Sequence, residues 1–525
     1  MTFVKVFPLL VTAAVIQICN GYRILGIYPF QGRSHFMVLN QLFKGLARKG
    51  HQVDLISVLP LEENHPNYTR IIELPNNIAI FMEALRSENS QSLSRNIPLM
   101  LGKVGYKLCE SMEAPEFLDL VRNPPKDIPY DVIITQTLCY PCFTILGYLW
   151  NIPVVVISTT SLYPWMHGMI GNPDNTAISP NNLISIPEGN NFWTRLVNTY
   201  LFYYIKLLYF YYTSNQDHLL QKLFGPNVPS IRELEQNISL ILMNTYFPLN
   251  GIKPMTTGLV EVGGLHIQND GPDLPDNLKK WLDKSKDGVV YFTLGSMFRI
   301  ETLAVEKVEI IFKSLEKIAP KQVLIRIEKP DELNVTIPKN FHHLLWMPQE
   351  KILQHPNVKA FITHGGLLGT QESIYYGVPM ICLPLVVDQW TNANSYVSKK
   401  IAITLDITKV TEDEFDFALG EILNNSIYRE NVKRLSGLFR DRPQSAMDTA
   451  AFWIEFVIRN GKDSLRSPAM DLTWWQLALL DVHAIAIAGI LTTVHITILI
   501  LKTFVRLIYL QKKKLVVLHN KKKLL

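Results

Sequence analysis

Short apolar runs alternate with amphipathic stretches along the chain from Tyr22 onward. The first unit of this pattern predicts a buried strand at Arg23–Tyr28, a turn at residues 31–34, a helix at residues 36–49 and a second strand at residues 52–58. Apolar side chains recur at helical spacing along the predicted helix, whereas the predicted strands are short and largely apolar. This alternation is typical of parallel β-sheets that carry helices on both faces.

Two series of predicted strands follow from the same pattern. In the first series, residues 131–135 and 153–158 flank another helix. The second series starts at Gly288, and its candidate strands are residues 289–294, 322–327, 344–346, 360–363 and 380–383. Between the two series, residues 261–275 are rich in Gly, Pro and Asp, as expected for an interdomain linker.

The two series predict an α/β fold with two Rossmann-like domains. A chain of 525 residues exceeds the roughly 250–300 residues over which one hydrophobic core keeps growing. We assign residues 22–260 to the first domain, 261–287 to the linker, 288–445 to the second domain and 446–473 to returning helices. Ligands of such folds bind at the carboxyl ends of parallel strands, so the cleft between the domains is the expected site.

Both ends of the chain indicate a membrane protein of the secretory pathway. Lys5, the apolar run at residues 6–18 and the small residues near Gly21 predict a signal peptide at residues 1–21, because the run is too short to span a bilayer. Residues 474–501 are apolar enough for a transmembrane helix. The basic tail at residues 502–525 has no acidic residue, which predicts a cytosolic tail and lumenal domains.

The last four residues, Lys-Lys-Leu-Leu, resemble the dilysine signal that returns type I membrane proteins to the endoplasmic reticulum. The alternative is a plain basic stretch at anionic lipid. We therefore expect a single-pass type I protein of the endoplasmic reticulum membrane. Four N-glycosylation sequons, at Asn67, Asn237, Asn334 and Asn424, would be usable in the lumen.

Charge and cysteine content exclude two other classes of protein. Without Lys5 and the eight basic tail residues, the basic residues no longer outnumber the 46 acidic ones, so no nucleic-acid-binding surface is indicated. Five cysteines, one of them in the predicted signal peptide, are too few for a disulfide-built scaffold.

Residues 192–212 contain ten aromatic side chains. This segment resembles a helix that contacts a membrane or lines an acceptor site, and a core helix covered by its neighbours explains the pattern equally well. Arg195 and Lys206 argue against a second membrane span.

The most specific stretch lies at residues 361–389, where the pattern predicts a strand, a glycine turn, a helix and another strand. Gly365, Gly366 and Gly369 leave room for a pyrophosphate to approach the backbone. The amides at the start of the helix supply hydrogen-bond donors, and His364 at the turn can add another. The sequence therefore predicts a binding site for a nucleoside diphosphate.

This stretch closely resembles the donor-binding signature of the family 1 UDP-glycosyltransferases, in which His-Gly-Gly at residues 364–366 is followed by Glu372 and by Asp-Gln at residues 388–389. In the second half of the chain, residues 346–349 resemble the family's uracil site and residues 288–297 its strand and loop. Residues 262–266 resemble the family's linker, and residues 32–35 resemble the start of its acceptor domain. The run into the membrane helix is also similar. The resemblance covers essentially the whole chain after the signal peptide and is nearest to insect members.

The resemblance implies a GT-B architecture, with two facing Rossmann-like domains that bind the acceptor and the donor, and a role in detoxification. It implies donor-binding roles for nine residues, which are Ser296, Trp346, Gln349, His364, Gly366, Gly369, Glu372, Asp388 and Gln389. Trp346 would stack on uracil beside Gln349, and Glu372 would accept hydrogen bonds from the ribose. The turn at His364 would hold the diphosphate, and residues 388–389 would bind the sugar.

By the same resemblance, His35 is the catalytic base that takes the proton of the acceptor hydroxyl. The displacement would invert the anomeric carbon, and UDP would leave as an anion stabilised by the glycine turn and His364. We expect no metal and no cofactor besides the UDP-sugar co-substrate, because the sequence has no Asp-x-Asp motif and no metal-ligand spacing.

One position departs from the family pattern. Many members carry an acid after the strand at residues 131–135, where it orients the catalytic histidine, and this chain has Gln136 there. An amide oxygen can accept the Nδ1 proton of His35, but it cannot offset the positive charge that develops on the imidazole. The enzyme is then slower, or another carboxylate serves, or an acidic acceptor such as a phenol makes the acid dispensable.

Two further functions stay open at this point. Cys139 and Cys142 form a Cys-x-x-Cys motif between a predicted strand and helix, the context of a thiol oxidoreductase. Gln136 also permits a UDP-sugar-binding membrane protein that has lost turnover. The acceptor is a small lipophilic molecule of unknown identity, the donor is UDP-glucose or UDP-glucuronate with glucose favoured, and a homo-oligomer is left open.

Overall fold

The structure is a computed structural model that describes residues 21–61, 65–75, 97–126, 129–179, 183, 191–296, 298–385 and 388–522. The predicted signal peptide, apart from Gly21, and residues 523–525 of the predicted retention signal lie outside the described residues. The chain divides into two compact units, residues 1–467 and residues 468–525.

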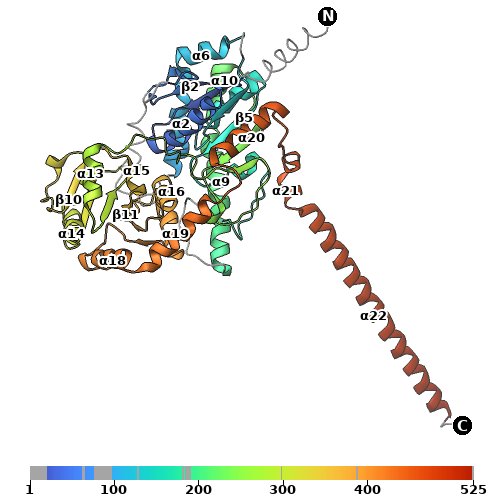
Figure 1. Cartoon of the computed structure of the whole chain (residues 1–525). Coiled ribbons are helices and arrows are strands. Elements are labelled where there is room, and N and C mark those ends of the chain that lie inside the picture. The colour runs from blue at the N-terminus through green and yellow to red at the C-terminus, as the bar shows by residue number, and fades with distance from the viewer. Residues whose placement is uncertain are drawn as a thin grey trace, which may run out of the picture. The chain divides into compact units, whose positions relative to one another are not determined.

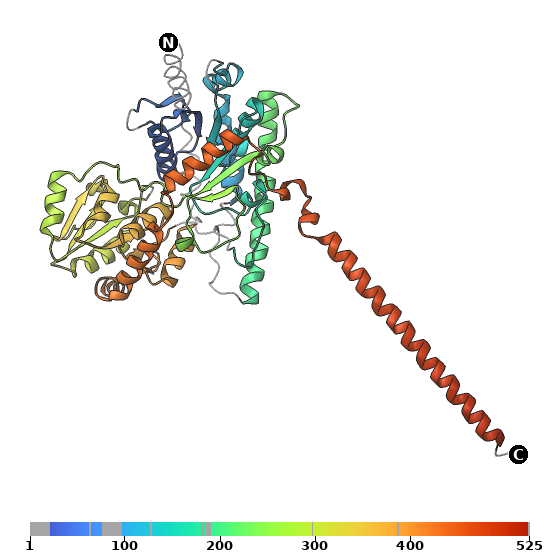
Figure 2. The same cartoon turned by 45° about the vertical axis from the view of Figure 1, so that its right-hand side comes forward.

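A parallel sheet forms the centre of the first half of residues 1–467 (Figures 1 and 2). Its strand order is β3-β2-β1-β4-β5-β6-β7, so β2 and β3 add on one side of β1 and β4 to β7 add on the other, as in dinucleotide-binding folds. The strands described are β1 (Arg23–Tyr28), β2 (Gln52–Ser57), β3 (Tyr68–Glu73), β4 (Val132–Thr135), β5 (Val154–Ser158), β6 (Ile238–Met243) and β7 (Leu259–Glu261).

A second parallel sheet repeats this arrangement in the order β10-β9-β8-β11-β12-β13. Its strands are β8 (Val289–Thr293), β9 (Gln322–Arg326), β10 (Phe341–Leu344), β11 (Val358–Thr363), β12 (Met380–Cys382) and β13 (Ala402–Thr404). We call the two sheets with their helices the first lobe and the second lobe. The predicted α/β fold with two Rossmann-like lobes is confirmed.

Helices cover both faces of the sheets (Figures 1 and 2). Those before β8 are α2 (Arg33–Arg48), η1 (Leu99–Val104), α5 (Gly105–Glu110), η2 (Ser111–Glu113), α6 (Pro115–Arg122), η3 (Pro141–Thr144), α7 (Ile145–Trp150), α8 (Met166–Met169), α9 (Phe192–Thr213), α10 (Gln216–Phe224), α11 (Ile231–Glu235), α12 (Phe247–Asn250) and α13 (Asp276–Lys284). Those after β8 are η4 (Ile300–Thr302), α14 (Val305–Glu316), η5 (Pro330–Glu332), α15 (Gln349–Gln354), α16 (Leu367–Tyr376), α17 (Asp388–Ser398), α18 (Glu412–Asn424), α19 (Ser426–Arg440) and α20 (Ala446–Asn460).

Most predicted strands are confirmed within two residues at each end, but one is misplaced. Residues 344–346 were predicted as a strand, whereas β10 ends at Leu344, and Leu345 and Trp346 are 63% and 60% exposed. The strands β3, β6, β7 and β13 are absent from the prediction. Short apolar runs carry little periodicity, so their pairing partners decide whether they become strands. The first helix also begins at Arg33, inside the predicted turn.

The chain crosses between the lobes twice. In the segment predicted as a linker, Leu265 packs in the core of the first lobe, and the helix α13 buries Leu278 and Leu282 in the core of the second lobe. After α19 the chain returns, and α20 buries Ala450 and Ile454 in the core of the first lobe, beside α2 and β6. The linker segment therefore contributes to the cores of both lobes, and the returning chain packs in the core of the first lobe.

The aromatic segment forms α9, and only one of its faces is covered. Its buried residues are Asn198, Phe202, Ile205, Tyr209 and Thr213. On the other face, Trp193, Tyr200 and Tyr211 are 70%, 66% and 71% exposed. The interpretation as a covered core helix is therefore wrong for half of its surface.

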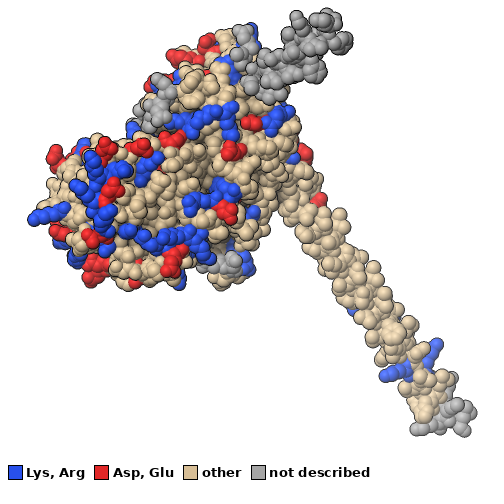
Figure 3. All heavy atoms as spheres, in the orientation of Figure 1, with Lys and Arg blue, Asp and Glu red and all other residues tan. Residues whose placement is uncertain are grey.

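Residues 468–525 contain η6 (Pro468–Asp471), α21 (Trp474–Leu477) and the long helix α22 (Leu480–Lys522). The helical span Leu480–Asn520 contains a stretch of 18 residues with a mean hydropathy of 2.3, and it is long and apolar enough to cross a membrane. In Figure 3 most of this helix is uncharged, and basic side chains gather toward its C-terminal end. The helix continues beyond residue 501, where the prediction ended it.

Gly26→Ala is expected to destabilise the protein. Gly26 lies in β1 beneath α2, and a Cβ atom there would come within 2.5 Å of the Phe43 ring. The buried ring would have to shift, at a cost of about 1–3 kcal/mol, and the thermal unfolding midpoint of the full chain in detergent should fall.

Gly420→Ala in α18 is the matched control, because a Cβ atom there meets nothing within 4 Å. Alanine is the better helix former, so stability should stay equal or rise by up to about 1 kcal/mol. Equal losses of stability in both variants would contradict the proposed close packing of α2 on β1.

Candidate functional site

A cavity of about 570 Å³ lies between the two lobes, and both lobes line it. The predicted site residues that line it are His35, Ser296, Trp346, Gln349, His364, Gly366, Gly369, Glu372, Asp388 and Gln389. Gln136 is buried behind His35 and does not line the cavity. Within the described chain, no residue of α9 lines it, so α9 is not the acceptor-lining helix.

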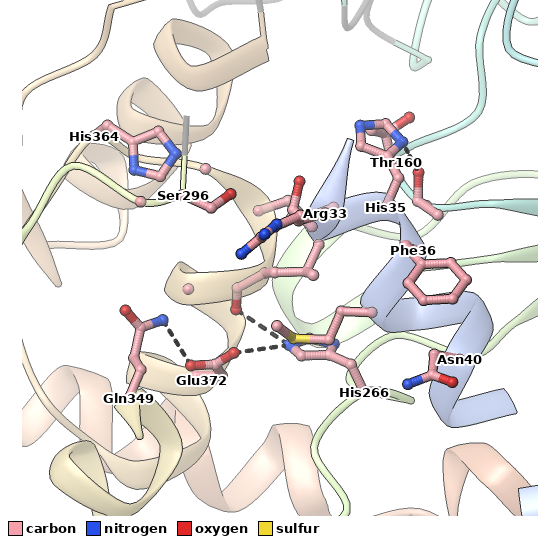
Figure 4. A pocket seen from close by; sticks show the side chains of 18 of the residues that line it. Arg33, His35, Phe36, Asn40, Thr160, His266, Ser296, Gln349, His364 and Glu372 are labelled. Carbon is pink, nitrogen blue, oxygen red and sulfur yellow. Dashed lines mark hydrogen bonds and ion pairs between the residues drawn. The ribbon is translucent and has the colours of Figure 1, made fainter. Parts of the chain in front are cut away.

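His35 sits in the first turn of α2, just beyond the carboxyl end of β1 (Figure 4). Its Nδ1 atom lies 2.6 Å from the hydroxyl oxygen of Thr159 and 3.0 Å from Nε2 of Gln136. Gln136 directly follows β4, and Thr159 directly follows β5. Because β1, β4 and β5 are neighbours in the sheet, the residues after their carboxyl ends lie close together. The rings of His35 and Phe30 are nearly perpendicular, with centroids 5.3 Å apart.

The amide of Gln136 is held in one orientation. Its Oε1 accepts a hydrogen bond from the Tyr140 hydroxyl (2.9 Å), and its Nε2 donates to Thr159 (2.8 Å). The amide nitrogen therefore faces Nδ1 of His35, whereas an acceptor role for the amide would place its oxygen there. Because Nδ1 is surrounded by donors, the neutral imidazole carries its proton on Nε2 in this arrangement.

Burial lowers the pKa of His35 to about 4. The imidazole is therefore neutral at physiological pH. A neutral imidazole is the form that a general base needs.

On the second lobe, His364 directly follows β11 and begins the glycine turn before α16. A Cβ atom on Gly366 would lie 2.5 Å from the His364 ring, and so would one on Gly295, whose φ is +80°. Glycine at both positions thus makes room for the imidazole itself. Nδ1 of His364 is buried without a partner among the described residues, and burial lowers its pKa to about 4.

Glu372 of α16 lies at the centre of a polar cluster in the cavity wall (Figure 4). Gln349 donates to one carboxylate oxygen at 2.7 Å, and Nε2 of His266 lies 3.4 Å from the other. The Tyr291 hydroxyl donates to Oε1 of Gln349 at 3.2 Å and so fixes its amide. A Cβ atom on Gly369 would lie 3.0 Å from this amide, so glycine again allows a close approach.

The other predicted donor residues lie around this cluster. The indole of Trp346 lines the cavity while 60% exposed, so its surface is open to a ligand. Asp388 begins α17, where burial raises the pKa of its carboxyl group and Asn392 donates to it at 3.3 Å. The side-chain oxygen of Gln389 accepts from the Leu385 amide at 2.8 Å.

Sequence reasoning missed Thr159, Tyr140 and His266 as site residues. Thr159 could have been found, because it directly follows a predicted strand on the side where ligands bind. Tyr140 and His266 carry no comparable signal, since only the folded chain brings them to Gln136 and Glu372.

The cysteine motif does not form a redox pair. Cys142 is bridged to Cys109, 33 residues away, and Cys139 is free and buried. Burial raises the pKa of Cys139 to about 12, which suppresses the reactive thiolate. The thiol oxidoreductase interpretation is therefore wrong. In the described part of the chain, no group of three or more His, Cys, Asp or Glu residues is placed to hold a metal ion.

Two parallel sheets that face one cavity with their carboxyl ends define the GT-B class of proteins. Two solved structures share this fold, namely the glycosyltransferase VinC in complex with DTDP (TM-score 0.57, 16% identity, 84% of this chain and 100% of that one) and the glycotransferase of kitacinnamycin (TM-score 0.53, 20% identity, 83% and 98%).

Residues 105–515 match the family described as UDP-glucoronosyl and UDP-glucosyl transferase. UDP-glucosyltransferase 2 of Dactylopius coccus is 33% identical over 488 residues, which cover 91% of this chain and 92% of that protein. UDP-glucuronosyltransferase 1A6 of Homo sapiens is 30% identical over 484 residues, with 89% of each chain covered. This chain belongs to the family 1 UDP-glycosyltransferases.

Thiol labelling should reflect the cysteine pairing. In the denatured full chain without reductant, Cys139 and Cys382 should react, and Cys109 and Cys142 should react only after reduction. In the native protein both free thiols should label slowly, because they are buried and burial raises the pKa of each to about 12. Peptide mapping by mass spectrometry checks this, and a Cys139–Cys142 bridge would contradict it.

Proposed function

We propose that this protein transfers a hexose from a UDP-sugar to a hydroxyl group of a small lipophilic acceptor, with inversion at the anomeric carbon and His35 as the general base. Family membership establishes the coarser statement, sugar transfer from a UDP-sugar. One observation supports the finer one. His35 from the first lobe and the Glu372–Gln349 pair from the second lobe line the same cavity.

The nucleotide would occupy the second lobe. Trp346 would stack on uracil, and Gln349 would bind its edge. Glu372 has one oxygen bound by Gln349 and would accept from the ribose hydroxyls with the other. The unpartnered Nδ1 of His364 would donate to the diphosphate, together with Ser296 and the amides at Gly366 and Gly369.

The sugar would lie against the start of α17. Asp388 would accept from its hydroxyls beside Gln389, whose side-chain oxygen accepts from the Leu385 amide. Glucose is favoured, because the relative named a UDP-glucosyltransferase is 33% identical, whereas those named UDP-glucuronosyltransferases are 29–30% identical.

The acceptor would occupy the first lobe, where the cavity wall is mainly apolar and aromatic. Its side chains there are Phe30, Phe36, Leu59, Ile97, Met100, Leu101, Leu138, Tyr163 and Trp165. Such a wall binds a lipophilic ring by removing its apolar surface from water. His35 lies beside this wall, with its ring nearly perpendicular to that of Phe30.

For His35 to act as a base, its ring proton must move from Nε2 to Nδ1. A half-turn of the Gln136 amide would bring its Oε1 atom to Nδ1 of His35. The same rotation would bring its Nε2 atom to the Tyr140 hydroxyl, which can accept a hydrogen bond from it. The Thr159 hydroxyl at 2.6 Å can donate to Nδ1 or accept from it. This cluster therefore serves either tautomer and would stabilise the base form without an acid.

The transfer step then balances. The acceptor proton passes to Nε2 of His35, the acceptor oxygen bonds to the anomeric carbon, and the bond to the β-phosphate breaks with its electron pair leaving on UDP. The Gln136 amide does not offset the positive charge that forms on the imidazole. Acceptors with acidic hydroxyl groups, such as phenols, give up their proton with less positive charge developing on the imidazole. Such acceptors would therefore suit the site best.

We further propose that the protein is a type I protein of the endoplasmic reticulum membrane, anchored by α22, with both lobes in the lumen. The span at Leu480–Asn520 and the basic residues after it support this orientation. The side chains of Asn67, Asn237, Asn334 and Asn424 are all exposed, as glycosylation requires. The exposed face of α9 keeps membrane contact open as a prediction.

Microsomes that contain the full chain should release UDP when supplied with UDP-glucose and a panel of phenols, and more slowly with UDP-glucuronate. His35→Ala should reduce the rate at least about 100-fold, because the general base is lost, while UDP still binds. If UDP binds but no donor supports release, the chain is the alternative, a UDP-sugar-binding protein without turnover.

Gln136→Asp should raise turnover by about 10-fold and shift the pH profile. A carboxylate beside Nδ1 stabilises the imidazolium and so raises the pKa of His35 from about 4. The acidic limb of kcat/KM, which reports the loss of the neutral base, should therefore move to higher pH. Gln136→Asn is the control, because asparagine has the same side-chain length as aspartate but no charge. It should leave the acidic limb of kcat/KM in place. A gain in turnover with both variants, or with neither, would count against His35 as the base.

A further inference from the structure

Arg33 is a cation of the cavity wall that has no ion-pair partner among the described residues. Two other basic side chains of the wall are engaged, because Arg326 pairs with Glu328 and Lys351 donates to the side chain of Asn269. Lys44 is engaged as well. The exposed side chain of Arg33 makes no ion pair or hydrogen bond within the described chain.

The position of Arg33 directs this charge across the cleft. Arg33 is the first residue of α2, two positions before His35. In Figure 4 its guanidinium points away from the first lobe toward Ser296, which follows β8 in the second lobe, and His364 lies on the same side. These are the residues that would hold the diphosphate.

The second-lobe residues that would hold the diphosphate are neutral, and the nearby Arg326, which donates to the Gly295 carbonyl, is already paired with Glu328. Burial lowers the pKa of His364 to about 4, so its imidazole is uncharged at neutral pH. Ser296 and the backbone amides at Gly366 and Gly369 contribute dipoles but no net charge. A diphosphate is strongly anionic, and its charge grows as the bond to the sugar breaks, so a facing cation would stabilise both the bound donor and the transition state.

We propose that Arg33 binds the diphosphate of the donor across the cleft, in a contact that joins the two lobes around the UDP-sugar. The proposal rests on the proposed function, because it requires a UDP-sugar in this cavity. The planar guanidinium suits two phosphate oxygens at once, which a lysine ammonium does not.

Another anionic group, the carboxylate of glucuronate, can also bind a guanidinium. It is present only in UDP-glucuronate, whereas the diphosphate is present in UDP, UDP-glucose and UDP-glucuronate alike. Ligands with and without the carboxylate therefore separate the two contacts.

The test is equilibrium binding of UDP, UDP-glucose and UDP-glucuronate to the full chain in detergent. Arg33→Gln should weaken all three by about 10-fold and reduce the dependence of binding on salt concentration. Arg33→Lys should lie between this variant and the wild type, because it keeps the charge without the planar fork. Arg434→Gln is the matched control, since Arg434 is exposed on α19 and does not line the cavity, and it should bind like the wild type.

Unchanged binding of UDP and UDP-glucose by Arg33→Gln overturns the proposal, and so does a loss confined to UDP-glucuronate, which assigns Arg33 to the sugar carboxylate instead. A wild type that binds none of the three ligands removes the proposed function as well. Arg33→Gln and the wild type should share one thermal unfolding midpoint, because Arg33 is exposed and has no partner to lose within the described chain.

Discussion

Hydrogen bonds between the lobes hold the two sheets around one cavity, and the candidate chemistry depends on them. Gln371 of α16 donates to the carbonyl of Asn244 at the end of β6 (2.9 Å), and His266 contacts the Leu368 carbonyl (3.3 Å). The helix α16 also carries Glu372, and the strands β1, β4 and β5 lie in one sheet with β6. Fixing α16 against β6 therefore fixes the donor side of the cavity against the His35 side, and the return of α20 to the first core reinforces this arrangement.

The cavity combines burial with sparse positive charge. His35 and His364 have pKa values lowered to about 4 by burial, and burial raises the pKa of the Asp388 carboxyl. Glu372 is satisfied by an amide rather than by a strong cation, since Gln349 donates to it. Such a site favours groups that gain charge only during a reaction, because uncompensated charges are costly where water is excluded. An unpaired arginine at the mouth of this site would then have a large effect on an anionic ligand.

The Gln136 position shows how one neutral group changes the acid–base chemistry that the site permits. A carboxylate would fix the Nδ1 proton of His35 and stabilise the imidazolium. The amide instead offers either an acceptor or a donor, and the hydroxyls of Tyr140 and Thr159 can match either orientation. If His35 is the base, its neutral form is available in this site without an ion pair, and we expect efficient transfer only to acceptors that release a proton readily.

The sequence by itself determined the architecture and the second lobe's ligand class. Alternating apolar runs specified the parallel sheets, and the local segment at residues 361–389 carried the signal for the predicted diphosphate site, because strand, glycine turn and helix start are contiguous in the chain. Local patterns did not determine the pairing of short strands such as β7 and β13, nor the end of β10 before Trp346, since neighbouring strands decide them.

Only the tertiary structure decided what surrounds His35 and Glu372. The groups at Nδ1 of His35 come from residues 136 and 159, and the second contact of Glu372 comes from His266, all more than 100 positions away in sequence from the residue they touch. The orientation of the Gln136 amide depends on Tyr140, and the pairing of Cys142 with Cys109 depends on where α5 packs. Hydrogen-bond partners and burial arise when distant strand ends converge, so neither they nor the pKa values that follow from them could be deduced from spacing along the chain.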